Sequence, residues 1–275
     1  QYAGAGMTWR RDSGRFYLMD QGYSGATGVW SVMPDSPVTT IRREPFVFPN
    51  FGSSTRDIPW GIAWDDDSSC FWITNILDNN VYAGCHLVRL RFEGDTWRYA
   101  PPTGFYGDTW RITEVMALYW MGGMENWIDR GFFCGTPVAA TGTMANHTAM
   151  FDPYTKTFIG NTVNGTSTSE RGCALIPFDS LYILTTGWNE RIHRKRDTTG
   201  LVLQQVSVSP SGPADWAMWV PEVIVPTDTA FVYCIYSDMP NSLTKVSTGM
   251  TWAQLPSVPS KFDVRPTAIL SPSSL

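Results

Sequence analysis

Charged residues are scarce in this 275-residue chain: Asp, Glu, Lys and Arg make up 16% of it, and only four positions are lysine. The formal net charge is −5, and no segment carries a dense run of basic residues. Proteins that bind DNA or RNA need such a basic surface, because contacts with the phosphate backbone dominate their affinity. We therefore expect no nucleic-acid partner.

Long apolar runs, cysteine pairs and catalytic motifs are also missing. No apolar run approaches the roughly 20 residues that a membrane-spanning helix requires, so we expect no membrane span. The five cysteines are far apart and form no C-x-x-C pair, which argues against a zinc knuckle or a thioredoxin-like site. The G-x-S-x-G elbow of hydrolases and the G-x-x-x-x-G-K-[ST] phosphate loop are absent as well. No motif therefore assigns a reaction, and the sequence favours a protein that is not an enzyme.

Aromatic and turn-forming residues are abundant instead. The chain contains 13 Trp, 11 Tyr and 14 Phe, together with 24 Gly and 19 Pro. Aromatic residues favour strands, and Gly and Pro favour tight turns. The composition predicts many short strands that are joined by turns.

Two stretches of the chain are near copies of each other. "GMTWRRDSGRFYLMD" (6–20) and "GIAWDDDSSCFWITN" (61–75) are 55 positions apart. Identical residues fall at five aligned positions without a gap: Gly6/Gly61, Trp9/Trp64, Asp12/Asp67, Ser13/Ser68 and Phe16/Phe71. Each copy has an apolar run, a polar turn and an alternating run, which predicts a β-hairpin. A hairpin that returns at a fixed period indicates a repeat architecture.

The pattern continues along the chain. Further copies of this inner hairpin begin at Val115, Gly172 and Trp216, and the first of these has its turn enlarged over 121–126. Between the inner hairpins we expect outer hairpins, which begin at Val29, Leu87, Ala149, Arg191 and Leu243. Their turns contain suitable residues, and the last turn is expected at Thr248-Gly249.

This alternation predicts an all-β fold of twenty strands, arranged in five four-stranded units of about 55 residues. A four-stranded sheet cannot bury both faces alone, so neighbouring sheets must pack face to face around an axis, as in a β-propeller. We predict a single propeller domain over 1–275. Its blades are expected at about 5–50, 51–105, 106–165, 166–210 and 211–260, followed by a tail at 261–275. The strand residues expected to fill the space between blades are Trp9, Trp64, Phe71 and Trp72.

The blade sequences resemble a known repeat group. "GIAWDDDSSCFWITN" and "AMFDPYTKTFIG" are similar to the two halves of a blade in the NHL, YVTN and streptogramin-lyase-like propellers. In those blades a G-hydrophobic-A-hydrophobic-D hairpin ends in an aromatic-rich strand and is followed by a D-P-x-T turn. The resemblance covers nearly the whole chain and implies a propeller fold, with fewer blades here than most members have.

The longer connections are expected at one end of the propeller. They are 43–60, 101–114, 134–146 and 164–171, and most turns at the opposite end are tight. Long loops on a rigid scaffold commonly carry binding residues. We therefore predict the ligand surface at this end, which is called the long-loop end below.

Acidic residues are expected at the start of the innermost strand of four blades: Asp57, Glu114, Glu170 and Asp215. Converging carboxylates at a channel mouth would suit Ca²⁺, or the acid and base of a glycoside hydrolase or lyase. Five-bladed glycoside hydrolases place their carboxylates near the axis. Alternatively, the acids cap turns or pair with neighbouring arginines. Nearby residues predicted to contact a ligand are Arg56, Trp60, Tyr106, Trp110, Arg111 and Arg171.

The histidines do not form a metal motif. His86, His147 and His193 each fall near the start of a third strand, away from the axis and in different phases. We therefore expect no resident metal. The "DDDSS" segment (65–69) resembles the start of a calcium loop but lacks the Gly and the terminal Glu of an EF-hand. The matching "RRDSG" of the first repeat indicates a hairpin turn instead.

These observations favour a binding or assembly module. We expect an extracellular or secreted propeller, which could also be located at a cell surface or on a virion. Its long-loop end is expected to bind a carbohydrate or a protein. The alternatives are a propeller hydrolase or lyase that uses the axial acids, and a structural subunit of a filament or virion that forms homo-oligomers. The first residue, Gln1, suggests a processed product. The tail is expected to close the ring beside the N-terminal strand, with addition to another copy's sheet as the alternative.

Overall fold

The described part of the chain is almost entirely β-strand. The computed structural model describes residues 4–20, 28–34, 37–48, 57–77, 85–99, 109–111, 120–127, 132–138, 147–163, 170–175, 183–187, 192–196, 202–207, 213–219, 221, 223–236 and 243–254. Within these residues the only α-helix is α1 (Pro37–Thr40), and the 3₁₀ turns are η1 (Arg11–Ser13) and η3 (Trp252–Gln254). The predicted all-β class is therefore confirmed. None of the described helices is long and apolar enough to cross a membrane.

Four of the sheets repeat one simple topology, in which strands pair antiparallel in chain order. The first contains β1 (Gly4–Arg10), β2 (Arg15–Asp20), β3 (Gly28–Val32) and β4 (Arg42–Glu44). The third contains β11 (Trp120–Trp127), β12 (Phe132–Val138), β13 (His147–Asp152) and β14 (Thr157–Val163). The fourth contains β15 (Glu170–Leu175), β16 (Ile183–Gly187), β17 (Ile192–Arg196) and β18 (Val202–Ser207). The fifth contains β19 (Pro213–Met218), β20 (Thr229–Tyr236) and β21 (Leu243–Thr251).

The second sheet has the same four-stranded centre and two additions. Its consecutive strands are β6 (Asp57–Asp65), β7 (Cys70–Leu77), β8 (Cys85–Glu93) and β9 (Thr96–Arg98). β5 (Phe46–Val47) pairs parallel with β9, and β10 (Thr109–Arg111) pairs antiparallel with β8. The segment that follows the first sheet therefore contributes an outer strand to the second.

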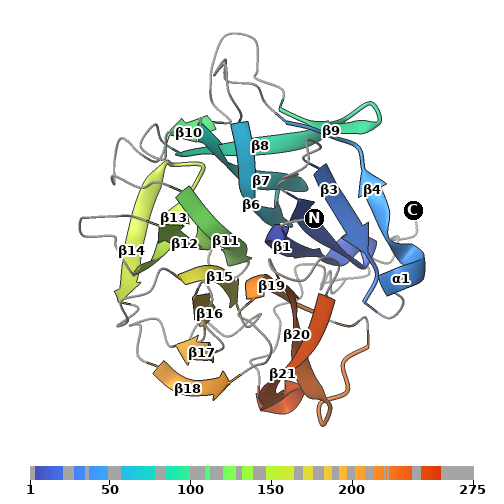
Figure 1. The fold of residues 1–275 in the computed structure, drawn as a ribbon, viewed down its shortest axis with the longest axis vertical. Helices are drawn as coiled ribbons and strands as arrows, with labels where there is room; N and C mark the ends of the chain where they lie inside the picture. The colour runs from blue at the N-terminus through green and yellow to red at the C-terminus, as the bar shows by residue number, and fades with distance from the viewer. Residues whose placement is uncertain are drawn as a thin grey trace, which may run out of the picture.

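The first strand of each sheet lies nearest the centre of the molecule. β1 contacts β6, β6 contacts β11, β11 contacts β15, β15 contacts β19, and β19 contacts β1 again. Figure 1 shows these strands around the middle, with β4, β9, β14, β18 and β21 toward the rim. The backbone N–H of Trp64 donates to Thr8 Oγ1 (3.0 Å), which links similar positions of β6 and β1. The fold is therefore propeller-like, with the first strands of the five sheets around its centre.

Local turn chemistry explains the hairpins. The Asp65 carboxylate accepts the backbone N–H groups of Asp67 (3.0 Å) and Ser68 (3.3 Å), and Asp152 does the same for Tyr154 (2.8 Å). An aspartate that binds the backbone two or three residues ahead stabilises a turn without help from the rest of the protein. The "DDDSS" segment is thus a hairpin turn, as its match in the first repeat predicts.

The core lies between neighbouring sheets. One cluster joins the first and second sheets and contains Tyr17, Trp64, Phe71 and Trp97, with Phe46 of β5 packed against it. A second cluster, which contains Met7, Phe16 and Val32 of the first sheet and Tyr233 and Ile235 of the fifth, is described below as the ring-closing core. These clusters confirm that Trp64 and Phe71 fill the space between sheets, and Trp9 packs against the ring-closing core. Trp72 is also buried, and its ring lies edge-on to Tyr154 of the third sheet.

Two expected turns are strands. Residues 121–126, expected as an enlarged turn, lie within β11, and the register shift between Met121 and Met124 shows that the glycine pair forms a bulge. The turn expected at Thr248-Gly249 is also wrong, because β21 runs through it and its register with β20 shifts there. Gly249 has a φ of 75°, and the Thr248 hydroxyl donates to the Ala230 carbonyl (2.8 Å). As a result the fifth sheet has three strands in the described part, where four were expected.

All four expected long loops contain strand residues, since β10 also lies within 101–114 and β15 begins within 164–171. Much of 43–60 is strand, because β4, β5 and the start of β6 fall within it. Phe46 explains this difference, since its ring lies 5.3 Å from Phe71 and 6.0 Å from Trp97 and holds the segment against the second sheet. Residues 134–138 of the expected loop 134–146 belong to β12. The segments expected at 101–108, 139–146, 164–169 and in the tail at 261–275 lie outside the described residues.

Candidate functional site

Three of the four predicted axial acids fall on innermost strands. Asp57 is the first residue of β6, opposite Leu77, and Glu170 is the first residue of β15, opposite Gly187. Asp215 is the third residue of β19, opposite Ile235. These backbone positions lie where the innermost strands begin, at the long-loop end. The side chains of all three, and Glu114 as a whole, lie outside the described part.

The fold places the aromatic and arginine residues that are predicted to contact a ligand in two different regions. Trp60 lies in β6 with Asp57, and Arg171 follows Glu170 in β15. Trp110 and Arg111 lie in β10, which pairs with β8, so β7 and β8 separate them from β6 and the centre. Arg56 and Tyr106 are outside the described residues. The backbone therefore brings Trp60 and Arg171 to the innermost strands and places Trp110 and Arg111 on the outer side of the second sheet.

The three histidines lie in third strands, as predicted. His86 is in β8, His147 begins β13, and His193 is in β17. Each of these strands is separated from the centre by two others in its sheet. Among the residues that the structure describes, no group of three His, Cys, Asp or Glu side chains is placed to hold a metal ion.

At the end opposite the long loops, Arg10 joins the first two sheets. Its guanidinium carbon lies 4.2 Å from the ring centroid of Trp64 and 5.2 Å from that of Trp97. Nε and Nη2 donate to the two carboxylate oxygens of Asp12, at 2.6 and 2.9 Å. Burial lowers the pKa of Arg10, but the hydrogen bonds and charge interactions with Asp12 and Tyr17 together outweigh it, so the pKa lies above its usual value. Arg10 therefore remains charged, with its guanidinium against the rings of Trp64 and Trp97.

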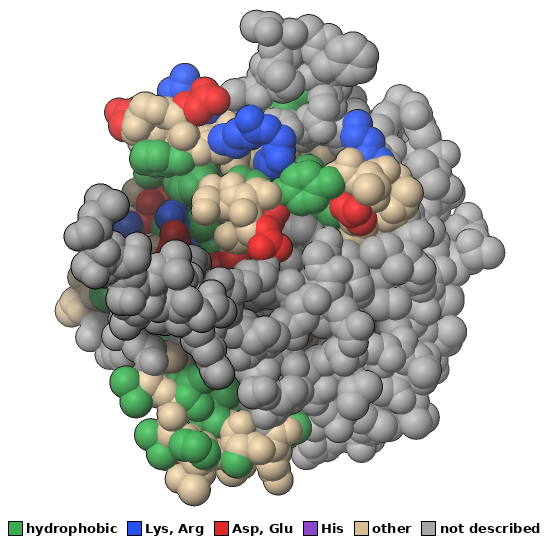
Figure 2. Space-filling view, turned by 180° about the vertical axis from the view of Figure 1, so that it is seen from behind, with side chains coloured by type: hydrophobic (Ala, Val, Ile, Leu, Met, Phe, Trp, Pro, Cys, Tyr) green, Lys and Arg blue, Asp and Glu red, His purple; other side chains and the backbone are tan. Residues whose placement is uncertain are grey.

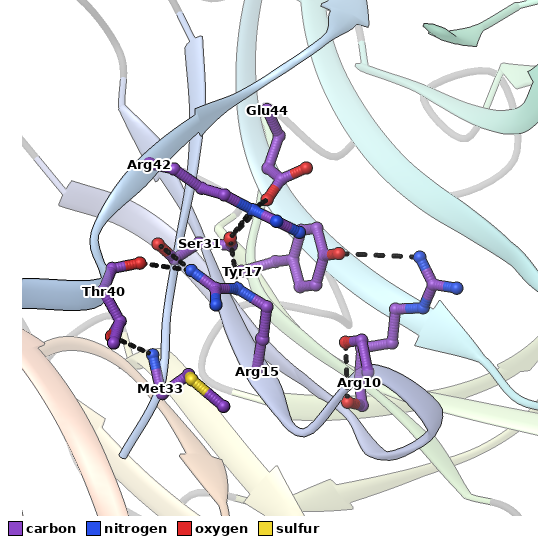
Figure 3. Close-up of polar contacts among 9 residues, drawn as sticks. Arg10, Arg15, Tyr17, Ser31, Met33, Thr40, Arg42 and Glu44 are labelled. Atoms are coloured by element: carbon purple, nitrogen blue, oxygen red, sulfur yellow. Dashed lines mark hydrogen bonds and ion pairs between the residues drawn. The ribbon is translucent and has the colours of Figure 1, made fainter. Parts of the chain in front are cut away.

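A second polar network lies within the first sheet (Figure 3). Arg15 is buried, and its Nε donates to Ser31 Oγ (2.7 Å) while Nη2 donates to the carbonyls of Ser31 (3.2 Å) and Thr40. The Ser31 hydroxyl donates to Glu44, whose carboxylate also pairs with Arg42 Nε (2.6 Å). Burial and the charge of Arg42 lower the pKa of Arg15. This network ties β2, β3, β4 and α1 together, so its role is structural.

Tyr154 links the third sheet to the second. It lies in the turn between β13 and β14, and its hydroxyl donates to the Asp65 carboxylate and lies 2.7 Å from Ser68 Oγ. Asp65 is buried, with 2% of its surface exposed, whereas Tyr154 is 44% exposed. A buried carboxylate needs such partners, because an unpaired charge away from water is costly. We call this contact the Asp65–Tyr154 clasp.

The thiol of Cys70 lies beside the clasp. Its Sγ is 3.8 Å from the Tyr154 hydroxyl, and the guanidinium of Arg89 lies 5.3 Å from the Tyr154 ring centroid. Burial, followed by the negative charge of Asp65, raises the pKa of Cys70 to about 12. Burial and the hydrogen bond to Asp65 also raise the pKa of Tyr154. Both groups are neutral near pH 7, so the clasp supplies neither a thiolate nucleophile nor a phenolate base.

The fifth sheet carries an ammonium group among aromatic rings. Lys245 Nζ lies 4.3 Å from the ring centroid of Phe231, 4.5 Å from Trp219 and 5.9 Å from Tyr233. Lys245 is exposed, and Trp219 and Phe231 are half-buried. This cluster was not foreseen, although the alternation of "FVYCIY" in β20 places Phe231 and Tyr233 on one face of the sheet.

Charges of both signs are mixed on the visible surface. Figure 2 shows Lys, Arg, Asp and Glu side chains together across the upper part of one face, beside hydrophobic side chains. A surface that selects nucleic acid needs a field of one sign. This face does not have one among the described side chains.

Comparisons with solved structures support the fold. The chain is similar to glutaminyl cyclase from Myxococcus xanthus, with 12% identity, a TM-score of 0.50 and coverage of 90% of this chain and 91% of that chain. It is also similar to an exo-β-1,3-galactanase from Phanerochaete chrysosporium, solved with β-1,3-galactotriose, with 9% identity, a TM-score of 0.50 and coverage of 84% of this chain and 55% of that chain. A protein of unknown function from Bacteroides caccae shares 8% identity at a TM-score of 0.49, over 91% of this chain and 80% of that chain.

At these identities the similarity concerns the fold alone, which is propeller-like. No protein-family model and no curated protein sequence matches the chain. The resemblance to NHL, YVTN and streptogramin-lyase-like blades therefore stays a prediction.

Proposed function

We propose that the chain is a single five-bladed β-propeller over residues 1–275 that acts as a binding module at its long-loop end. The support for five blades is the set of five sheets in the described part, whose first strands contact one another in a closed sequence from β1 to β19 and back. The blade limits follow the sequence repeat, at about 55 residues each.

One observation carries the proposed surface: Asp57, Glu170 and Asp215 lie near the starts of innermost strands that belong to three different sheets. Innermost strands converge on the centre, so the residues that begin them lie around one region at that end of the molecule. Trp60 lies in the same strand as Asp57, and Arg171 follows Glu170. Carboxylates that accept sugar hydroxyls, together with an aromatic ring, suit a carbohydrate ligand, and Arg beside Glu also suits a protein surface.

The opposite end supports this choice by its own contacts. There Arg10 pairs with Asp12 and stacks on Trp64, and Asp65 accepts from Tyr154. These groups satisfy one another, so they stabilise the packing of neighbouring sheets. Binding at the long-loop end leaves this structural end intact.

A glycan array tests the proposed surface. The wild type is expected to bind a defined set of glycans, and Asp57→Asn/Glu170→Gln is expected to bind them about tenfold more weakly. The matched control is Glu93→Gln/Asp95→Asn, which makes the same change in net charge on exposed residues at the other end of the second sheet. Equal loss in the control, or glycan binding that the first variant leaves unchanged, would contradict the proposal. If the ligand is a protein, the first variant should weaken binding to that protein and the control should not.

The alternative is a propeller glycoside hydrolase or lyase with Asp57, Glu114, Glu170 and Asp215 as acid, base or Ca²⁺ ligands. The same convergence of acids favours it, because the two carboxylates of a glycosidase lie roughly 5 to 10 Å apart. Release of new reducing ends from polysaccharides distinguishes the two. An enzyme should lose activity about a hundredfold or more in Asp57→Asn, Glu170→Gln or Asp215→Asn, whereas a binding module releases no new ends.

We also propose that the protein is extracellular, at a cell surface or on a virion. Its low charge and few lysines are not typical of a protein that binds nucleic acid or a membrane surface. A structural subunit of a filament or virion is the remaining candidate. Size-exclusion chromatography with light scattering separates it from a monomeric module, since a structural subunit is expected to form homo-oligomers.

A further inference from the structure

The rings of Trp219, Phe231 and Tyr233 surround the ammonium group of Lys245, and together they are called the Lys245 cage. All three centroids lie within 5.9 Å of Nζ. Aromatic faces attract cations at distances up to about 6 Å. The geometry is therefore that of a cation site that a lysine of the same chain already fills.

Strand register builds the cage. Tyr233 lies directly opposite Lys245 in the pairing of β20 with β21, and Phe231 lies two residues before Tyr233 on the same face. Trp219 follows the last residue of β19, and its ring is edge-on to Tyr233, at 6.1 Å and 86°. Two positions of β20 and the residue that follows β19 thus supply the rings.

The floor of the cage is held by the ring-closing core. Tyr233 is 6% exposed, and its ring lies 4.7 Å from Phe16 of the first sheet. Trp219 packs against the same core. Rings that are fixed before a ligand arrives lose little freedom on binding, which favours affinity. Lys245, in contrast, is exposed and sits on a flexible four-carbon stem.

The three rings of the cage are the partners of the Lys245 charge among the described residues. Among the residues that the structure describes, no carboxylate pairs with Lys245. A primary ammonium is strongly hydrated, so it can leave the rings for water at little cost. A quaternary ammonium has no N–H groups to hydrate and keeps its charge, so the rings favour it over lysine.

We propose that the Lys245 cage is a binding site for a quaternary or methylated ammonium group, which displaces Lys245 into solvent. Lys245 then acts as an internal competitor that keeps the rings apart when no ligand is present. The site lies on the fifth sheet and depends on none of the acids at the long-loop end, so it goes beyond the proposed function. Figure 2 shows hydrophobic side chains at the lower edge of the molecule, where Figure 1 places β20 and β21, and exposed Val223 and Val225 lie in the segment just before β20.

Calorimetric titration with choline tests the proposal, because choline has a neutral isostere in 3,3-dimethylbutanol. Lys245→Ala removes the competitor and is expected to bind choline about tenfold more tightly than the wild type. Adding Trp219→Leu to Lys245→Ala is expected to weaken choline binding about tenfold. Phe92→Leu, which changes a 53% exposed ring on the second sheet, is the matched control and should leave binding unchanged.

Peptides that contain trimethyl-lysine or unmodified lysine identify the source of the ammonium group. Tighter binding of the trimethyl-lysine peptide than of choline indicates a methylated protein side chain, and the reverse indicates a small molecule. Either result supports the site, provided that the neutral isostere binds at least tenfold more weakly than choline.

Three results would overturn the proposal: no binding of choline or trimethyl-lysine by the wild type and Lys245→Ala up to about 10 mM, equal binding of 3,3-dimethylbutanol, or full binding after Trp219→Leu. Circular dichroism and thermal unfolding check that each variant folds. If Lys245→Ala does not fold, Lys245→Gln, which keeps the stem and removes the charge, replaces it in the same titrations.

Discussion

Arg10 and Asp65 occupy equivalent positions in the first two repeats and make different contacts. Arg10 points its charge at Trp64 and Asp12, whereas Asp65 accepts from its own turn and from Tyr154 of the next sheet. The repeat predicts both positions, because each directly follows the Trp of its own copy at the same distance from the Gly. It does not predict the partners, since Trp97 and Tyr154 lie in distant segments that only the folded ring brings near.

The Asp65–Tyr154 clasp gives a stability prediction for Tyr154→Phe, which removes only the hydroxyl. A buried carboxylate that loses a donor costs about 1–2 kcal/mol of the free energy of unfolding. Urea unfolding of the wild type, Tyr154→Phe, Asp65→Asn and the double variant measures it. The two single effects should not add, because they break one contact. Additive effects would show that Tyr154 does not act through Asp65.

Cys70 gives a prediction for the dependence of stability on pH. Its pKa is raised from 9.0 to about 12 in the folded protein, so the thiol ionises in the unfolded chain at a lower pH than in the fold. This contribution to stability is fully present below pH 9 and is lost as pH rises toward 12. Unfolding at several pH values should show a steeper fall for the wild type than for Cys70→Ala. Parallel curves would contradict the burial of a neutral thiol, since other titrating groups are common to both proteins.

Hairpins are the elements that the sequence predicts best. An aspartate or a glycine at a turn acts locally, so the turns at 66–69, 94–95 and 153–156 could be foreseen. The sequence predicts turns at 121–126 and at Thr248-Gly249, but in both places the strand continues with a register shift near glycine. Strand β5 could not be foreseen either, because it forms through pairing with β9 and contacts of Phe46 with Phe71 and Trp97, which lie further along the chain. These features depend on contacts between segments that are far apart in the chain. A local sequence pattern does not reveal such contacts.

Gly94, in the turn between β8 and β9, tests how much a left-handed backbone conformation costs in stability. Gly94 has a φ of 65°, and a Cβ there would meet nothing within 4 Å. Gly94→Ala should therefore lower the free energy of unfolding by about 1–2 kcal/mol through backbone strain alone. Gly28→Ala is the comparison, since its Cβ would meet only the flexible Arg43 side chain, at 3.4 Å, and it should cost less. A larger loss for Gly28→Ala in urea unfolding would show that steric contact with Arg43 costs more than the positive φ at Gly94.

The whole molecule depends on contact between the first and last described sheets. The 55-residue period predicts this contact, because sheets that repeat around an axis must meet where the ring ends. The period also predicts which strands lie innermost, and hence the backbone positions of Asp57, Glu170 and Asp215. It does not predict the Lys245 cage, whose rings follow from the ring-closing core of one pair of sheets. The repeat thus predicts where the candidate surface lies. The chemistry of that surface depends on side chains that differ from one repeat to the next.

Phe16 provides the test of ring closure. It is fully buried in the ring-closing core, with its ring 4.8 Å from Trp9 and 4.7 Å from Tyr233. Phe16→Ala should lower the free energy of unfolding by about 3–5 kcal/mol, through lost burial and the cavity that remains. Phe92→Ala removes a 53% exposed ring and should cost much less. If the ring unfolds as one unit, hydrogen exchange in Phe16→Ala rises in β20 as much as in β1 and β2, although β20 lies over 200 residues away in the chain. Faster exchange confined to β1 and β2 would mean that the two sheets unfold independently and that their contact does not close the ring.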